Sequence, residues 1–543
     1  MQGGRSASAK ARSLKKCAAS NIMSEHRHLL KSASLISAFT ILSRIFGYIR
    51  DSRIAFLLGA GTAADAYTTA YRIPNLFRRL VGEGAVSAAF IPIFTRYIAE
   101  NREEDGWKFA NTMLTVMTIL LTVLTIAGIL LSPLIVRLFA SGFGDTPGKL
   151  ELTAALNRIM FPYIFLISLS ALSMGILNSF HRFGTPAFVP VVLNLTMVAF
   201  SFLGGLFGDV TRTLAVGVVA GGVLQLAIQI PALLKTGWKI GFKVDFHHPG
   251  VQQVVKLMVP VIFGVGIVQV NVLVGTQFAS YLVEGSVTAI YIADRVMEFV
   301  LGVYAVAVST VILPLLSRQA ALRQMDELKT TLNFATRLIL FITFPATVGL
   351  ILLRHEIIEV LFQHGGFTAA STALTAWALP FFAIGLSAFS MVKVIVPAFY
   401  ALQDTRTPVK VAFFAMFLNI GLNFLFIGPL QNGGPALATS FAAFFNSAAL
   451  LVIFYRRYGS FGVWGILQSV GKFAVASMAL AVVAYGMIHW PGFYAGHTSQ
   501  KVLALGVTIG MGAGTYFGTA ALLRTREVTE FRLVKKTTVR SEA

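Results

Sequence analysis

Long apolar segments recur along the whole chain, and they restrict its fold more than any other feature. A helix needs about 20 mostly apolar residues to cross a lipid bilayer, and the sequence contains fourteen segments of that kind. Short segments of alternating polarity, which would indicate a membrane β-barrel, do not appear. The sequence therefore predicts an all-α polytopic membrane protein with 14 transmembrane helices. The predicted spans cover residues 33–58, 63–97, 109–140, 152–178, 185–207, 211–234, 252–281, 287–317, 330–361, 370–400, 408–428, 433–455, 463–488 and 502–523.

The charge composition excludes several classes of protein. The formal net charge is +21, yet only 12% of the residues are charged and 56% are hydrophobic. A soluble nucleic-acid-binding protein would carry about 25% charged residues, so we expect no nucleic acid among the partners. The single cysteine, Cys17, excludes a scaffold built on disulfides.

Lysine and arginine residues concentrate on one side of the predicted topology. The even-numbered loops contain 14 of them, whereas the odd-numbered loops and nearby helix ends contain 5. The tails before residue 32 and after residue 523 add seven and six more. Because cytoplasmic loops are enriched in lysine and arginine, we expect the even-numbered loops and both termini to lie in the cytoplasm.

The two halves of the chain resemble each other. AVSAAFIPIFTR at 85–96 matches AVSTVILPLLSR at 307–318 at an offset of 222 residues, and Thr185-Pro186 matches Thr407-Pro408 at the same offset. LSALSM at 169–174 also matches LSAFSM at 386–391, at an offset of 217. Each copy contains six spans, so both would insert with the same orientation, as in transporters built from parallel repeats.

The repeat predicts the domain organisation. We expect a basic cytoplasmic tail over residues 1–31, then two pseudo-symmetric six-helix lobes over residues 32–235 and 251–457. Two extra C-terminal helices over residues 463–523 and a cytoplasmic tail over residues 524–543 follow. Substrate sites in parallel-repeat transporters lie between the halves, near the middle of the bilayer.

Several predicted spans carry charges at membrane depth, where such residues usually face a cavity or a charged partner. The bases are Arg44, Arg50, Arg53, Arg72, Arg78, Arg79, Arg295 and Lys393, and the acids are Asp51, Asp65, Glu83, Asp294 and Glu298. Asp65, Arg72 and Arg79 are seven residues apart and share one helix face. Arg295 and Glu298 are three apart and can pair within their own helix.

Eight bases against five acids leave a surplus of three positive charges. Guanidinium groups suit phosphate oxygens, so the surplus predicts an anionic substrate that carries phosphate or carboxylate. Internal ion pairs and side chains that extend to the membrane surface are the competing explanation, which we favour for Arg53. P-loop, HExxH, CxxC and GxSxG motifs do not occur. We therefore expect a transporter rather than an enzyme, with no metal site and no cofactor.

Five motifs resemble the MurJ (MviN) family of lipid II flippases, which is in the same superfamily as the multidrug and toxin extrusion transporters. They are SRIFGYIRD at 43–51, GAGTAADAY at 59–67, RIPNLFRRLVGEGAVSAAFIPIF at 72–94, YIADRVMEF at 291–299 and VKVIVPAFYALQDTRTPVKV at 392–411.

The resemblance implies a bacterial inner-membrane protein that moves lipid II, the lipid-linked peptidoglycan precursor, to the periplasmic leaflet. Lipid II, membrane lipids and proteins of cell-wall synthesis are the partners it implies. The family's functional charges map onto Arg44, Arg50, Asp65, Arg78, Asp294, Arg295 and Glu298, and the candidate substrate-binding set also includes Arg79. Some relatives use an acid of the seventh span for a sodium site. Residues 252–281 contain no acid, so the resemblance does not extend to sodium coupling.

We expect alternating access between the two lobes. The pyrophosphate would bind Arg44, Arg50, Arg78 and Arg295, with Asp65 and Glu298 orienting these bases. Three alternatives stay open. A flippase for another undecaprenyl-pyrophosphate-linked glycan would share the anionic group, a multidrug antiporter of the same fold should have a surplus of carboxylates, and a non-transporting scaffold for cell-wall assembly would need no internal arginine surplus.

Overall fold

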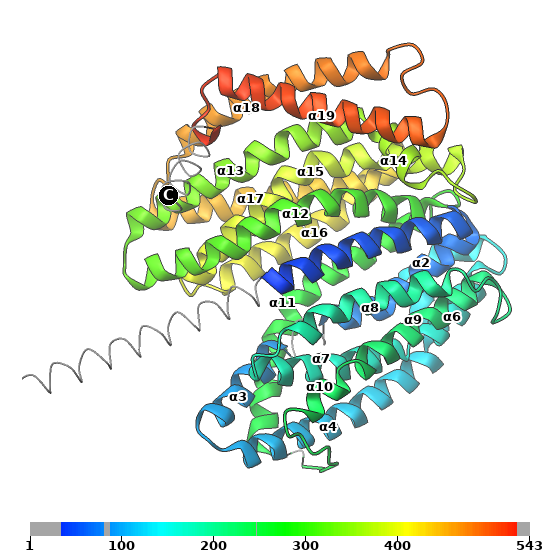
Figure 1. Ribbon diagram of the computed structural model, residues 1–543, viewed down its shortest axis with the longest axis vertical. Coiled ribbons are helices and arrows are strands. Elements are labelled where there is room, and N and C mark those ends of the chain that lie inside the picture. The colour runs from blue at the N-terminus through cyan, green and yellow to red at the C-terminus, as the bar shows by residue number, and fades with distance from the viewer. Residues whose placement is uncertain (1–33, 81–86, 246, 529–543) are drawn as a thin grey trace, which may run out of the picture. The chain divides into compact units, whose positions relative to one another are not determined.

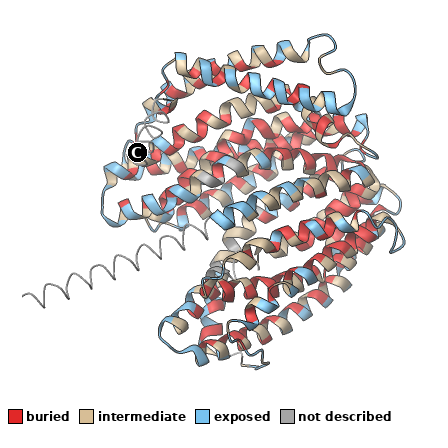
Figure 2. Cartoon of the chain, in the orientation of Figure 1, coloured by how far each residue is buried: buried red, intermediate tan, exposed pale blue. Residues whose placement is uncertain are grey.

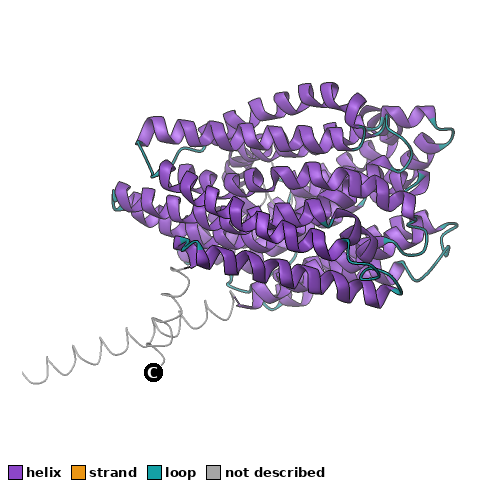
Figure 3. Ribbon diagram, turned by 90° about the horizontal axis from the view of Figure 1, so that it is seen from above, coloured by secondary structure: helices purple, strands orange, loops and turns teal. Residues whose placement is uncertain are grey.

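The computed structural model describes residues 34–80, 87–245 and 247–528, and these residues contain helices and loops but no β-strand (Figure 3). The first helix covers residues 34–58. The later elements are α2 (Thr62–Phe77), α3 (Ser87–Ala99), α4 (Glu103–Leu130), α5 (Ser132–Phe139), the 3-10 helix η2 (Ser141–Asp145), α6 (Lys149–Met160), α7 (Tyr163–Ser179), α8 (Gly184–Phe200), α9 (Val210–Ala227), α10 (Ile230–Leu234), α11 (Pro249–Ala279), α12 (Ser286–Ala321), α13 (Met325–Leu352), α14 (Arg354–Phe362), α15 (Ala369–Ala401), α16 (Arg406–Leu430), α17 (Gly433–Tyr458), α18 (Val463–Ile488) and α19 (Thr498–Leu522).

Within the described residues, ten helical segments are long and apolar enough to cross a membrane. Each coincides with one of the predicted spans. The other four predicted spans correspond to the first helix, to α2 with α3, to α8 and to α12. The first helix, α2 and α12 carry the charges noted in the sequence, and α8 has only 17 residues. Glu83, with its neighbouring glycines, lies outside the described residues.

The chain divides into two compact units. One comprises residues 1–51, 77–127 and 159–262, and the other comprises residues 52–76, 128–158 and 263–543. In the first unit α8 packs on α9, α9 on α7, and α7 on α3. In the second unit α15 is central and contacts α12, α13, α14 and α17 (Figure 1). Figure 2 shows α15 largely buried, whereas α18 and α19 carry many exposed residues.

The two C-terminal helices dock on α13 through an aromatic cluster. The ring of Phe341 lies 5.3 Å from the rings of both Phe473 on α18 and Tyr516 on α19. The Tyr516 hydroxyl also donates a 2.6 Å hydrogen bond to the backbone carbonyl of Phe341. That carbonyl has no helical partner, because Pro345, four residues later, has no N–H. The proline therefore creates the acceptor that α19 uses.

A buried ion pair ties the segment after α19 to the same helix. Arg337 donates a 2.7 Å hydrogen bond to Glu527, and both side chains are almost fully buried. Arg337 also contacts Asn333, whose amide donates to the backbone carbonyls of Phe461 and Gly462. Neither Arg337 nor Glu527 is among the charges that the sequence predicted at membrane depth.

Candidate functional site

Asp65 on α2 is a buried carboxylate that holds the start of α12. One carboxylate oxygen accepts hydrogen bonds from the backbone N–H and the hydroxyl of Thr288, at 2.9 and 2.8 Å. The other accepts a 2.8 Å hydrogen bond from the backbone N–H of Gly285. These amides belong to the first turn of α12, where helical N–H groups lack partners and the helix dipole favours a negative charge. Asp65 thus caps a helix distant from it in sequence.

Lys149, the first residue of α6, completes the environment of Asp65. Its ammonium lies 2.9 Å from the carboxylate, and the side chains of Lys149 and Asp65 are only 4% and 2% exposed. It also lies 4.2 Å from the centre of the Phe143 ring. The fourth predicted span, residues 152–178, begins after Lys149, so the sequence did not indicate this lysine as a partner of Asp65. The expected role of Asp65 in orienting the arginines stays a prediction.

A second acid, Glu284, holds the start of α2. Its carboxylate accepts 2.6 Å hydrogen bonds from the hydroxyl and the backbone N–H of Thr62. These hydrogen bonds lower the pKa of Glu284 below its ordinary value. Thr62 and Glu284 are 222 residues apart, which is the offset of the sequence repeat.

Tyr291 on α12 brings two arginines together. The guanidinium carbon of Arg72 lies 5.2 Å from the centre of its ring, and that of Arg295 lies 5.0 Å away. Arg295 also donates a 3.1 Å hydrogen bond to the Tyr291 hydroxyl, while Arg72 donates a 2.6 Å bond to the Thr276 hydroxyl. The result is a pair of cations on one aromatic ring, which is a favourable arrangement for guanidinium groups.

The predicted pair between Arg295 and Glu298 is confirmed. Their side chains approach to 2.9 Å and are 29% and 38% exposed. The bonds to Glu298 and Tyr291 fix the direction of the Arg295 guanidinium group, which stays partly exposed. Asp294, one turn before Glu298, is partly buried. Arg295 is therefore both oriented and accessible.

In the other compact unit, Arg50 is a buried predicted site residue whose side chain is held by two neighbours. It is 6% exposed, and it donates to Asp51 at 2.9 and 2.7 Å and to the Asn194 amide oxygen at 3.0 Å. Asn194 in turn donates to the backbone carbonyl of Ser43 at 2.9 Å. Sequence reasoning missed Asn194, because an amide within an apolar helix gives no charge signal.

The remaining predicted site residues lie in this same unit. Arg44 is half-buried on the first helix, and Arg78 and Arg79 are half-buried in the short π-helical stretch that follows α2. Lys393 on α15, counted among the membrane bases, is exposed. Sequence reasoning did not single out Tyr291, the first residue of the YIADRVMEF motif, or Thr276, because both contact arginines through uncharged groups.

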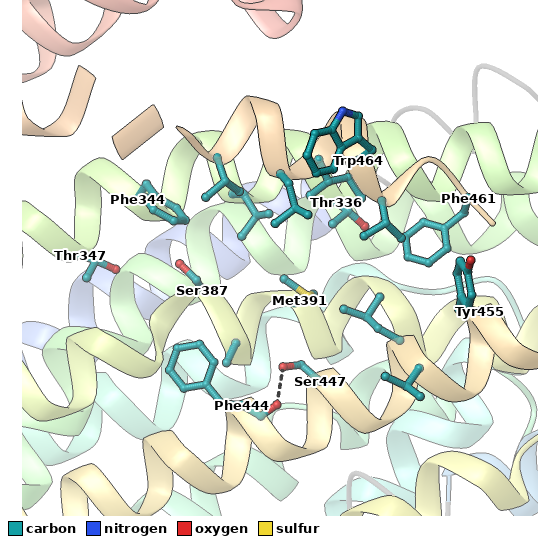
Figure 4. A pocket seen from close by; sticks show the side chains of 18 of the residues that line it. Thr336, Phe344, Thr347, Ser387, Met391, Phe444, Ser447, Tyr455, Phe461 and Trp464 are labelled. Atoms are coloured by element: carbon teal, nitrogen blue, oxygen red, sulfur yellow. Dashed lines mark hydrogen bonds between the residues drawn. The ribbon is translucent and has the colours of Figure 1, made fainter. Parts of the chain in front are cut away.

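An apolar cavity of about 1030 Å³ lies between α13, α15, α17 and α18 (Figure 4). Aromatic and aliphatic side chains line most of it, including those of Phe344, Met391 and Trp464. The few polar groups are mostly hydroxyls such as those of Ser387 and Ser447, and the latter donates to the Phe444 carbonyl. Its lining suits a hydrocarbon chain better than a charged group.

Comparison with known proteins decides the family. A family model described as lipid II flippase MurJ matches residues 54–491. The chain belongs to the MurJ family. The resemblance predicted from the five motifs is therefore confirmed.

Individual MurJ proteins align over nearly the whole chain. The probable lipid II flippase MurJ of Vibrio cholerae serotype O1 is 37% identical over 517 residues, covering 92% of this chain and 97% of that protein. The corresponding protein of Rhizobium tropici is 36% identical over 503 residues, covering 91% and 94%.

Solved structures give the same answer for the fold. A lipid II flippase MurJ in an inward closed conformation matches with a TM-score of 0.76 and 28% identity, covering 90% of this chain and 98% of that one. An inward-facing multidrug resistance MATE family transporter of the MOP superfamily matches with a TM-score of 0.59 at 14% identity, a likeness of fold alone. MurJ membership and the ten apolar helices indicate a multi-pass inner-membrane protein.

Proposed function

We propose that this chain flips lipid II from the cytoplasmic to the periplasmic leaflet by alternating access. The lobes over residues 32–235 and 251–457 would alternate, with fourteen spans and both termini in the cytoplasm. The observation that carries the proposal is a set of oriented arginines in spans of a MurJ-family chain. Arg50 is fixed by Asp51 and Asn194, and Arg295 by Tyr291 and Glu298.

The arginines supply the chemistry that a pyrophosphate requires. A planar guanidinium donates two parallel hydrogen bonds to phosphate oxygens. Arg50 and Arg295 would bind the pyrophosphate together with Arg44 and Arg78, and Arg79 would add positive charge. Glu298 orients Arg295, and Asp294 adds a negative charge on the same helix face that limits the excess of positive charge before substrate arrives. Asp65 acts through the helix it caps.

The apolar part of the substrate needs a different environment. The polyprenyl chain would stay in lipid and enter between spans, and part of it could occupy the apolar cavity lined by α13, α15, α17 and α18. Replacing Ser447 by Trp would occupy part of that cavity. We expect this variant to weaken transport of long-chain lipid II more than that of a short-chain analogue, in the same vesicles.

The deciding experiment is transport of labelled lipid II in vesicles that contain the purified protein. We expect Arg50→Ala and Arg295→Ala to abolish transport while membrane insertion is retained. Arg354→Ala is the matched control, because this arginine is exposed at the start of α14. Transport at the wild-type rate in either the Arg50→Ala or the Arg295→Ala variant would refute the assigned site.

The same assay separates the alternatives. A flippase for another undecaprenyl-pyrophosphate-linked glycan would move that glycan and not lipid II, and it would fail to relieve a block in peptidoglycan-precursor export. A multidrug antiporter would move organic cations. A scaffold would move nothing and would tolerate the arginine substitutions in a growth assay.

A further inference from the structure

The segment between α10 and α11 is fixed against α4 although it forms no regular secondary structure. Residues 238–245, which we call the strap, contain no helix, strand or turn. Asn111 on α4 accepts hydrogen bonds from the Trp238 indole at 2.7 Å and from the Gly241 N–H at 3.2 Å. Its amide donates to the Lys239 carbonyl at 3.0 Å, and the Lys243 N–H donates to the Thr115 hydroxyl at 3.0 Å.

The spacing of these bonds makes the strap extended along α4. One turn from Asn111 to Thr115 rises about 6 Å, and two extended residues cover about 6.6 Å. Gly241 and Lys243 are two residues apart and reach Asn111 and Thr115 respectively. Alternate side chains of an extended segment point to opposite faces, so one face of the strap points away from α4.

That outward face is apolar. Ile240, Phe242 and Val244 are 52%, 75% and 63% exposed, and they occupy alternate positions. Three large apolar side chains on one face, each more than half exposed, mark a surface that binds another apolar phase or molecule.

Basic residues accompany the apolar face. Lys239 and Lys243 lie between its members, and Lys235 precedes the strap; all three are exposed. The nearby carboxylate of Asp245 is half-buried, and its oxygen accepts a hydrogen bond from the His247 N–H. The strap therefore combines apolar side chains with a net positive charge.

Aromatic residues at the same end of the unit indicate how deep the strap lies in the membrane. The Trp107 ring stacks on Trp238 at 6.3 Å and on Phe180 at 5.5 Å. Tryptophan concentrates where a membrane span meets the headgroup layer. The apolar helix α4 begins near the strap, and the apolar segment formed by α9 and α10 ends just before it. In the proposed topology, this end of the unit lies at the bilayer surface.

We propose that the strap is a membrane-surface anchor that recognises anionic phospholipids. Phe242, Ile240 and Val244 enter the boundary between headgroups and acyl chains. Lys239 and Lys243 leave the strap on its opposite face, and their long, exposed side chains extend to the negatively charged headgroups. A lysine near an anionic surface contributes about 1 kcal/mol. The assignment does not depend on the substrate that the chain transports, because it concerns a surface outside the arginine site.

The test places a probe on the strap of the full-length protein. Cys17 is the only cysteine, so a Cys17→Ser, Phe242→Cys variant takes one environment-sensitive fluorophore at residue 242. Glu100→Cys in the same background is the matched control, because Glu100 is exposed in the loop before α4. Both are reconstituted in vesicles of phosphatidylcholine with and without phosphatidylglycerol, and quenched with aqueous iodide or with shallow nitroxide lipids.

In vesicles with phosphatidylglycerol, the label at residue 242 should be quenched by the nitroxide lipids and protected from iodide, unlike the label at residue 100. Lys239→Gln with Lys243→Gln should lower the ratio of protected to accessible label about thirtyfold, the equivalent of two lysines. The Lys→Arg pair should retain it, which separates loss of charge from misfolding. Equal iodide access at residues 242 and 100 would overturn the anchor. Protection that is equal in both lipid mixtures would overturn the recognition of anionic headgroups.

Discussion

At the scale of single residues, the buried pair of Asp65 and Lys149 is the most informative feature. Asp65 and Lys149 are both buried and pair at 2.9 Å. In a low-dielectric interior, an unpaired charge is far more costly than a neutral group. The function of Asp65 can therefore be examined only together with Lys149.

We expect Lys149→Met to destabilise the protein by about 3–5 kcal/mol, because Asp65 would stay buried without its partner. The double variant Asp65→Asn with Lys149→Met should recover much of that loss, since neither charge is then left alone. Thermal unfolding in detergent measures both effects. Lys501→Met is the control: its pair with Glu359 is partly exposed, so its loss should cost less than about 1 kcal/mol. Equal destabilisation by the two lysine variants would contradict this account.

The acid stability of the protein should depend in part on Glu284. Hydrogen bonds from Thr62 lower the pKa of this carboxyl in the folded state. A lowered carboxyl pKa stabilises the fold above the unfolded-state pKa, about 4.3 for glutamate, and that contribution is lost as pH falls through the lowered value. Glu284→Gln should therefore flatten the acid side of the stability profile, measured by thermal unfolding against pH. An unchanged profile would show that the Thr62 contact is not coupled to folding.

At the scale of elements, the length of the apolar segments predicted where the helices lie. It did not predict which charged residues of those helices pair with one another. The ten apolar helical segments coincide with predicted spans, because about 20 apolar residues suffice to define a span. Lys149 and Arg337 were missed for a physical reason. Lys149 stands at the start of a helix and resembles a loop residue, and Arg337 is paired with an acid 190 positions away. The residue pattern of one helix does not show which residue of another helix will be its partner.

Docking of α19 on α13 offers a prediction at this scale. Tyr516→Phe removes the hydroxyl that donates to the carbonyl freed by Pro345, and we expect a loss of about 1–3 kcal/mol for the unsatisfied buried acceptor. Adding Pro345→Ala restores a helical N–H for that carbonyl and should reduce the penalty of the Tyr516 substitution. A double-mutant cycle of thermal unfolding tests this. Additive effects would mean that the two residues do not share the carbonyl.

At the scale of the whole molecule, we expect the membrane potential to assist the proposed transport. An inside-negative potential favours export of an anion by about 2.3 kcal/mol per charge for each 100 mV, which is about fiftyfold per charge in an equilibrium ratio. The rate of lipid II flipping in vesicles should therefore rise when a potassium diffusion potential makes the compartment that loses lipid II negative. A transport rate that does not depend on the sign or size of the potential would exclude this driving force.

The contacts of Asp65 and Glu284 also make the starts of α2 and α12 depend on each other. Glu284, just before α12, accepts hydrogen bonds from Thr62 at the start of α2, and Asp65 on α2 accepts hydrogen bonds from Gly285 and Thr288 at the start of α12. Each helix start therefore receives its carboxylate from the other helix or from the residues just before it. If one start moved without the other, two carboxylates and several N–H groups would lose their partners, which is costly for buried polar groups. We therefore expect the starts of α2 and α12 to move together as one rigid piece.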